Sequence, residues 1–143
     1  MLAEFSTDHN KLSVWRIEKE EDLNDVFVAM ASNRPSIGKL EFAKIFPEDI
    51  SDLSFDDEEG DTPTFGINQK HGNILDLNYV TLGDVILCIA HSIDKNGTIM
   101  RTRSQVRSLL VDAYKNHKLD IENMEPKVAQ EILVYAENTL SIK

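Results

Sequence analysis

The chain lacks most of the residue patterns that mark catalytic or cofactor sites. Cys88 is the only cysteine in 143 residues, so no internal disulfide can form, and a zinc site would have to rely on histidine and carboxylates. The six glycines never stand two apart and none begins a phosphate-binding loop. No Gly-x-Ser-x-Gly motif occurs either. We therefore expect a non-enzymatic protein without a cofactor or a metal.

Long apolar runs are also missing. The longest, residues 85–90, is far shorter than the roughly 20 residues that span a bilayer. The first ten residues include Glu4 and Asp8 and lack the basic start and apolar stretch of a signal peptide. A lone cysteine fits a reducing compartment. The sequence predicts a cytoplasmic protein that does not bind membranes.

Basic residues are absent from residues 45–69, and in that gap the acids concentrate. Eight acidic residues lie there: Glu48, Asp49, Asp52, Asp56, Asp57, Glu58, Glu59 and Asp61. This acidic window, residues 48–61, carries -8 of the formal net charge of -10. A protein with a pI of 4.8 is repelled by nucleic acid and by anionic lipid, so a basic protein is the natural counterpart.

What remains resembles an ordinary globular chain, with 41% hydrophobic residues and a length typical of one domain. We expect a single domain over residues 1–143 with an exposed acidic loop at about 47–63, because like charges and turn residues oppose regular structure there. Ile50 and Leu53 are expected to clip this loop to the body through a short helical turn. Apolar spacing predicts four strands, at residues 12–18, 39–46, 64–68 and 74–80, the last two joined by a hairpin loop at 69–73.

Helical spacing is clearest from Glu20, where three acids open a helix whose buried face holds Leu23, Val26, Phe27 and Met30, with Val28 off that face. Two more helices are expected after a cap at Thr102 or Ser104 and around Pro126. Residues 82–93 fit a buried helix opening at Thr81, but 85–93 also fit a strand turning through Asn96-Gly97. The fold class is α+β: a small, mostly antiparallel sheet of about four strands, one helix between the first two, and a helical C-terminal half.

Three smaller constellations could carry chemistry. Cys88 and His91 share a helical face, yet no second pair completes a metal site. Residues 92–103 imitate a calcium loop, but Ser92 and Arg103 stand where it needs carboxylates. His71, near Asp76 in sequence, is the best placed histidine for a general base. An ordinary thiol, a turn and a surface histidine explain each of them more simply.

The favoured hypothesis is an inhibitor or immunity protein whose acidic loop occludes the basic active-site cleft of a partner such as a nuclease toxin. Its carboxylates would match a cleft shaped for phosphates, and the interleaved apolar residues would anchor it. Toxin immunity proteins are similar in being small, acidic and free of cofactors, which is a likeness of composition. The predicted partner-binding residues are Asp52, Phe55, Asp56, Asp57, Glu58, Glu59 and Asp61.

The alternative hypothesis is a DNA-binding regulator that uses the basic C-terminal half, residues 98–118. Six of the seven charged residues between 95 and 118 are basic, a local charge of +5. The expected order of strand, helix and helix is that of a ribbon-helix-helix protein, with Arg101 and Arg103 alternating on the strand. The acidic window opposes this reading, since it would be repelled by DNA.

Overall fold

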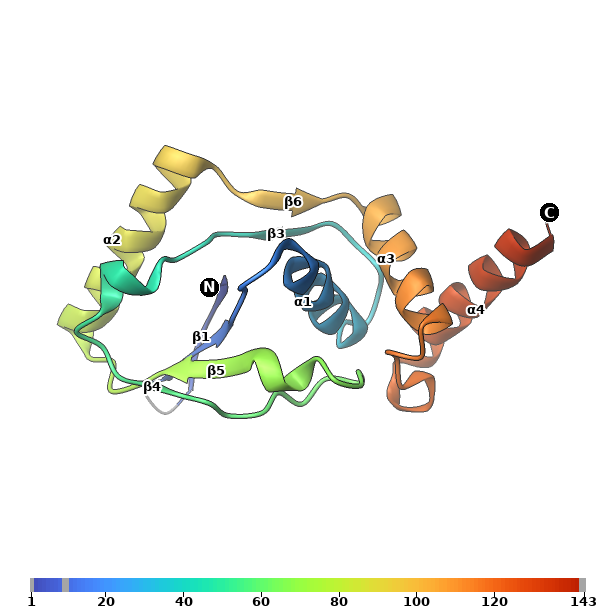
Figure 1. The fold of residues 1–143 in the computed structure, drawn as a ribbon, viewed down its shortest axis with the longest axis horizontal. Coiled ribbons are helices and arrows are strands. Elements are labelled where there is room, and N and C mark those ends of the chain that lie inside the picture. Colours follow the sequence, from blue (N-terminus) through green and yellow to red (C-terminus); the bar gives the residue numbers. More distant parts are fainter. Residues whose placement is uncertain (1, 9–10, 142–143) are drawn as a thin grey trace. The chain divides into compact units, whose positions relative to one another are not determined.

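A computed structural model describes residues 2–8 and 11–141, with side chains from 11 to 138 (Figure 1). Contacts divide the chain into two units, each assembled from three segments. The first unit contains Met1–Glu18, Glu41–Gly60 and Gln69–Met100, and the second contains Lys19–Leu40, Asp61–Asn68 and Arg101–Lys143. The fold class is α+β with a helical C-terminal half, as predicted.

The first unit is built on a sheet in the order β1-β2-β5-β4. Its strands are β1 (Leu2–Asp8), β2 (Lys11–Trp15), β4 (Phe55–Asp56) and β5 (His71–Ile74). Leu12 of β2 lies opposite Ile74 of β5, and Phe55 of β4 lies opposite the same isoleucine. Each pairing is antiparallel. Strand β4 stands at one end of the order, so it is an edge strand.

Helix α2 (Tyr79–Asn96) covers the core of the first unit, together with the short turn η1 (Pro47–Ile50) that lies against it in Figure 1. The buried core residues are Leu12, Val14, Ile45, Ile50, Ile74, Leu77, Val85 and Ile89. Leu53 packs against this cluster, so the clip predicted for the acidic loop is confirmed. Burial of such side chains is the main driving force for folding of the unit.

The second unit is helical, with α1 (Glu20–Ser32), α3 (Arg103–Lys115) and α4 (Pro126–Ser141). Helix α3 contacts both α1 and α4. Its cap is Thr102, whose hydroxyl accepts a hydrogen bond from the backbone N–H of Gln105 at 3.3 Å. Val28 is buried, against the prediction that it lies off the buried face of α1. Strands β3 (Leu40–Phe42) and β6 (Ile99–Arg101) pair with each other.

The strands predicted at residues 64–68 and 74–80 are wrong. Thr64 forms only an isolated bridge with Leu119, and the Asn68 side chain bonds back to Thr62, which closes a local turn instead of a ladder. The expected hairpin loop at 69–73 is instead the turn η2 (Asn68–Lys70) followed by β5. After β5 the chain adopts φ 57° at Asp76 and enters a helix.

That helix, α2, settles the ambiguity at residues 85–93, so the alternative of a strand is wrong. It begins two residues before Thr81, because Asn78 is its cap. The Asn78 side-chain oxygen accepts from Val80 N at 2.9 Å and Thr81 N at 3.0 Å, while Thr81 Oγ1 accepts from Asn78 N at 2.8 Å. The helix ends before Gly97, at φ 71°, a value that favours glycine.

Candidate partner-binding surface

The acidic window is not simply the exposed loop that its charge predicts. Phe55 and Asp56 form β4 and pair with Ile74 and Asn73 of β5. The backbone carbonyl of Asp56 lies so close to Gly72 that a Cβ there would be 2.6 Å from its oxygen. A glycine on β5 is thus what lets the acidic edge strand sit against the sheet.

Asn73 holds two carboxylates of the window side by side. Its Nδ2 donates to Asp56 Oδ1 at 2.9 Å and to Glu58 Oε2 at 2.7 Å. Asn73 is buried, whereas Asp56 is half-buried and Glu58 is exposed. Two like charges that meet at one neutral amide repel each other, so holding them together requires free energy from the rest of the fold.

Two basic side chains flank this pair of carboxylates. Lys11 Nζ lies 3.7 Å from Glu58 Oε2, and Arg16 Nη1 lies 3.0 Å from Asp57 Oδ1. All four side chains are at least two-fifths exposed, so each ion pair contributes only about 0–1 kcal/mol. The pairs orient the carboxylates without neutralising the window.

Other predicted contact residues are free to meet a partner. Asp52 and Glu59 are exposed and have neither a hydrogen bond nor an ion pair through their side chains within the part of the chain that the structure describes. Phe55 is 41% exposed on the same edge strand. Asp61, in contrast, belongs to the second unit. The structure therefore gathers six of the seven predicted residues in one unit.

His71 has a structural partner in place of the predicted one. Its Nδ1 donates to the Glu58 backbone oxygen at 2.7 Å, and its ring meets Trp15 edge to face at 5.0 Å. Asp76 forms no hydrogen bond with it. The imidazole fastens the chain after β4 to β5.

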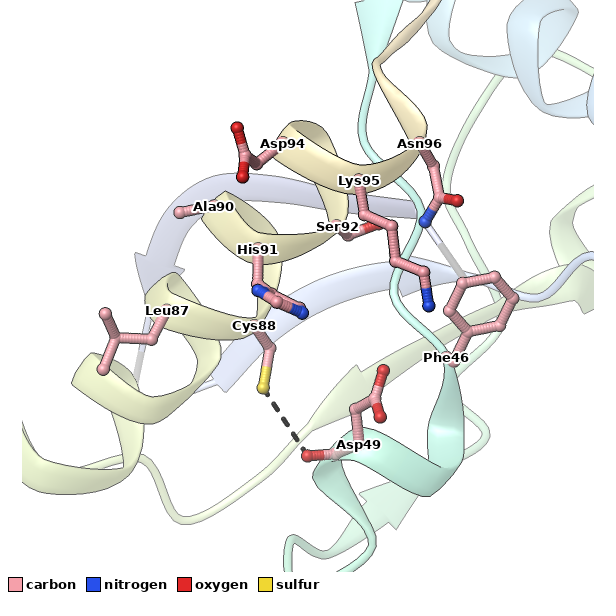
Figure 2. A pocket seen from close by; sticks show the side chains of 10 residues that line it. All are labelled: Phe46, Asp49, Leu87, Cys88, Ala90, His91, Ser92, Asp94, Lys95 and Asn96. Atoms are coloured by element: carbon pink, nitrogen blue, oxygen red, sulfur yellow. Dashed lines mark hydrogen bonds between the residues drawn. The ribbon is translucent and has the colours of Figure 1, made fainter.

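A cavity of about 720 Å³ opens beside α2 in the first unit. Figure 2 shows the Cys88 thiol pointing toward Asp49 of η1, with His91 and Lys95 also on this side of the helix. Cys88 Sγ donates to the Asp49 backbone oxygen at 3.5 Å. Burial, reinforced by Asp49 and Asp84, raises the pKa of the thiol. Cys88 is therefore a protonated thiol and a poor nucleophile at neutral pH.

The arginines of the alternative DNA-binding surface are engaged within the second unit. Arg101 lies over the Phe27 ring at 5.0 Å. Arg103 Nη2 lies 2.6 Å from Glu131 Oε1, and Arg107 stacks on Tyr135 at 3.9 Å. Lys118 pairs with Asp25 at 3.1 Å. These contacts hold the basic side chains that a DNA surface would need to extend toward phosphates.

Residues 92–96, the first part of the supposed calcium loop, lie in α2. Among the side chains of residues 11–138, no three His, Cys, Asp or Glu groups converge as metal ligands would. No helix in the described chain is long and apolar enough to cross a bilayer.

Sequence reasoning missed Asn73, Lys11 and Arg16, which organise the window. Their partners lie 15 or more residues away, and only the pairing of β2, β5 and β4 brings them together. The pattern of apolar residues gives no signal for that pairing. The sequence matches no family model, and comparisons with curated proteins and with solved structures gave no match.

Proposed function

We propose that this protein is a non-enzymatic inhibitor that docks its acidic edge onto a basic partner, such as the cleft of a nuclease toxin. We define the acidic edge as residues 52–59. The observation that carries the proposal is the pair of carboxylates, Asp56 and Glu58, held together on the Asn73 amide. Repulsion between the two carboxylates opposes what their hydrogen bonds to Asn73 contribute, so we interpret the pair as an arrangement kept for a cationic ligand.

Preorganisation explains why the arrangement would help binding. A mobile acidic loop loses conformational entropy when it docks, whereas carboxylates already fixed by β4, Asn73 and Arg16 lose less. The negative field accelerates encounter with a basic surface. Phe55 supplies exposed apolar area beside the charges, as an anchor residue does in many interfaces.

Partner capture at two salt concentrations tests the proposal. The immobilised protein should retain a basic protein from the source cell at low salt and lose it at high salt. Adding the free protein should then inhibit the nuclease activity of the captured one. A captured protein that is not basic, or a nuclease that keeps its full activity, would contradict the proposal.

Charge-matched variants show whether the acidic edge is responsible. Asp52→Asn with Glu59→Gln removes two charges that have no partner in the described chain. Glu122→Gln with Glu125→Gln removes two exposed charges in the second unit, so both double variants have a formal charge of -8 instead of -10. The first should slow association about tenfold at low salt, and the second should change it little.

The DNA-binding alternative, through residues 98–118, makes an opposite prediction. The observed order of β6, α3 and α4 is that of the strand, helix and helix it requires, although β6 pairs with β3 of the same chain. A gel-shift titration with duplex DNA at low salt separates the two hypotheses. Binding that Arg101→Ala and Arg103→Ala abolish would favour the regulator, and we expect no shift.

A further inference from the structure

Helix α2 has a second apolar face, on the side away from the core of the first unit. Tyr79 is 98% exposed, Leu87 is 68% exposed and Ile86 is 45% exposed. Val80 and Ile93 of the same helix are exposed as well. Figure 2 shows Leu87 and Ala90 projecting from the side of the helix turned away from Asp49. The sequence predicts a buried helix here. The helix is confirmed, but only one of its faces is buried.

The exposed face has the spacing of a helix-pairing seam. Five residues follow one another at alternating intervals of four and three: Tyr79, Gly83, Ile86, Ala90 and Ile93. This is the spacing at which two helices pack along their length. Large and small side chains alternate along the seam, so no two large residues follow one another.

Gly83 gives independent support, because no contact within the described part of the chain requires a glycine there. Among the described residues, no atom lies within 4 Å of a Cβ placed at Gly83, and its backbone is helical. Glycine inside a helix is less stable than alanine at the same place. A glycine that costs stability and clears no internal contact is explained when another surface approaches from outside.

We propose that this face pairs with the same face of a second copy, with the two α2 helices antiparallel. In this register Ile86 of one copy lies opposite Ala90 of the other, and Gly83 lies opposite Ile93. Tyr79 then lies opposite Gly97, just beyond the helix end. Every large residue of the seam meets a small one, so the face is complementary to itself.

The charges around the seam argue against an anionic lipid surface as its partner. The five seam residues carry no charge, and the nearest exposed charges are Asp84 and Asp94. Helices that lie on membranes usually carry lysine or arginine beside the apolar face, whereas aspartates there are repelled by anionic lipid. An uncharged self-complementary seam fits another copy of itself better.

The size of the exposed face sets the expected affinity of the dimer. A helix of 18 residues is about 27 Å long, and one such contact buries less than the roughly 1,200 Å² of a stable complex. The net charge of -10 on each copy also opposes association. The dimer is therefore weak and concentration-dependent, and it strengthens as salt is added. Docking of the acidic edge has the opposite salt dependence, so the two proposals can fail separately.

Sedimentation velocity over a concentration series up to about 1 mM measures the dimer directly. The wild-type mass should rise toward that of two copies, and Ile86→Glu should weaken dimerisation at least tenfold. Val134→Glu is the matched control, since Val134 is 46% exposed but lies on α4. A wild type that stays monomeric, or equal weakening by both variants, would overturn the proposal.

Gly83→Ala separates dimerisation from folding. The added methyl group has room within the monomer, so the variant should unfold at a higher temperature than the wild type. In the dimer the same methyl group presses against the partner's Ile93, so dimerisation should weaken several-fold. A variant that is more stable and dimerises as well as the wild type would contradict the close approach at Gly83.

Cysteine pairs test the antiparallel register. With Cys88→Ser as background, Ile86→Cys and Ala90→Cys chains should form a disulfide when they are mixed and oxidised. Each variant alone should form little, because the two equivalent residues are displaced along the helices. Strong cross-linking of either variant alone would show a parallel pair and overturn this register. Concentration-independent monomers that bind anionic vesicles would assign the face to lipid instead.

Discussion

The two units of the molecule differ sharply in charge. The first unit has 14 acidic and 5 basic residues and a formal charge of -9, whereas the second has 11 and 10 and a charge of -1. The second unit uses its cations internally, as in the pairs Arg103 with Glu131 and Lys118 with Asp25. The first leaves acids such as Asp52 and Glu59 without partners in the described chain. The acidity of the protein is thus a property of one unit.

This difference is why both binding proposals fall on the first unit. The described side chains of the second unit give a helical core with its charges largely balanced. The first unit presents two unsatisfied surfaces, the acidic edge and the outer face of α2. The proposed docking of the acidic edge should weaken as salt is added, whereas the proposed pairing of two α2 helices should strengthen. Salt concentration therefore separates them.

The largest predicted loss of stability comes from truncating a core side chain in either unit, and it shows whether the two units unfold together. Ile74→Ala in the first core and Leu110→Ala in the second should each lower the free energy of unfolding by about 2–5 kcal/mol. Because the chain crosses between the units five times, we expect calorimetry to show one transition that both substitutions shift. Two transitions, each shifted by only one substitution, would show independent units.

Asn73→Asp should be the most damaging change in the acidic edge. It replaces the shared amide with a third carboxyl group, and we expect a loss of about 2–4 kcal/mol at pH 7. Repulsion raises the pKa of the introduced group in the folded state, so the folded state binds its proton more tightly. The loss should therefore shrink as pH falls below that pKa. Urea titrations at pH 7 and pH 5 measure this, and an equal loss at both would contradict it.

Gly72→Ala should loosen the edge strand more mildly. The new Cβ would lie 2.6 Å from the Asp56 backbone oxygen, so β4 must shift, at about 1–3 kcal/mol. Hydrogen exchange should quicken at β4 and β5, with the second unit unchanged. Gly38→Ala is the control, because a Cβ there meets no atom of the described residues within 4 Å. Equal effects of the two substitutions would show that β4 does not depend on its close approach to Gly72.

The smallest effect is expected where the charges are free. Asp52→Asn with Glu59→Gln should alter the free energy of unfolding by less than about 0.5 kcal/mol, since neither side chain has a partner in the described chain. Thermal unfolding checks this. A clear loss of stability would mean that these acids serve the fold and would weaken the proposed role in binding.

Helix-capping residues and apolar spacing predict the helices, whose contacts are between residues close in the sequence. The acids at Glu20 and the apolar spacing after them predict α1, and Thr102 predicts the start of α3. The strand expected at residues 64–68 failed because Asn68 bonds to Thr62 and closes a turn. Edge strand β4 was missed because its pairing with β5 outweighs the repulsion among its acids.

The candidate surface was predicted in part for the same reason. Charge composition is visible in the sequence, and it pointed to the acidic window. The contacts that order the window depend on Asn73 and Arg16, which only the folded sheet brings close. The exposed half of α2 was hidden as well, because its apolar residues resemble a core face until the structure shows which side is covered.

The most direct test of the acidic edge as a docking surface is a titration with a short arginine–lysine peptide at low salt. Binding is monitored through the amide chemical shifts of the protein. The account predicts that the shift changes concentrate on residues 52–59 and disappear in high salt. They should weaken in the Asp52→Asn, Glu59→Gln variant, which keeps Asp56 and Glu58, but persist in the Glu122→Gln, Glu125→Gln control. Changes spread over the acids of both units, or unaltered by the first variant, would contradict the claim.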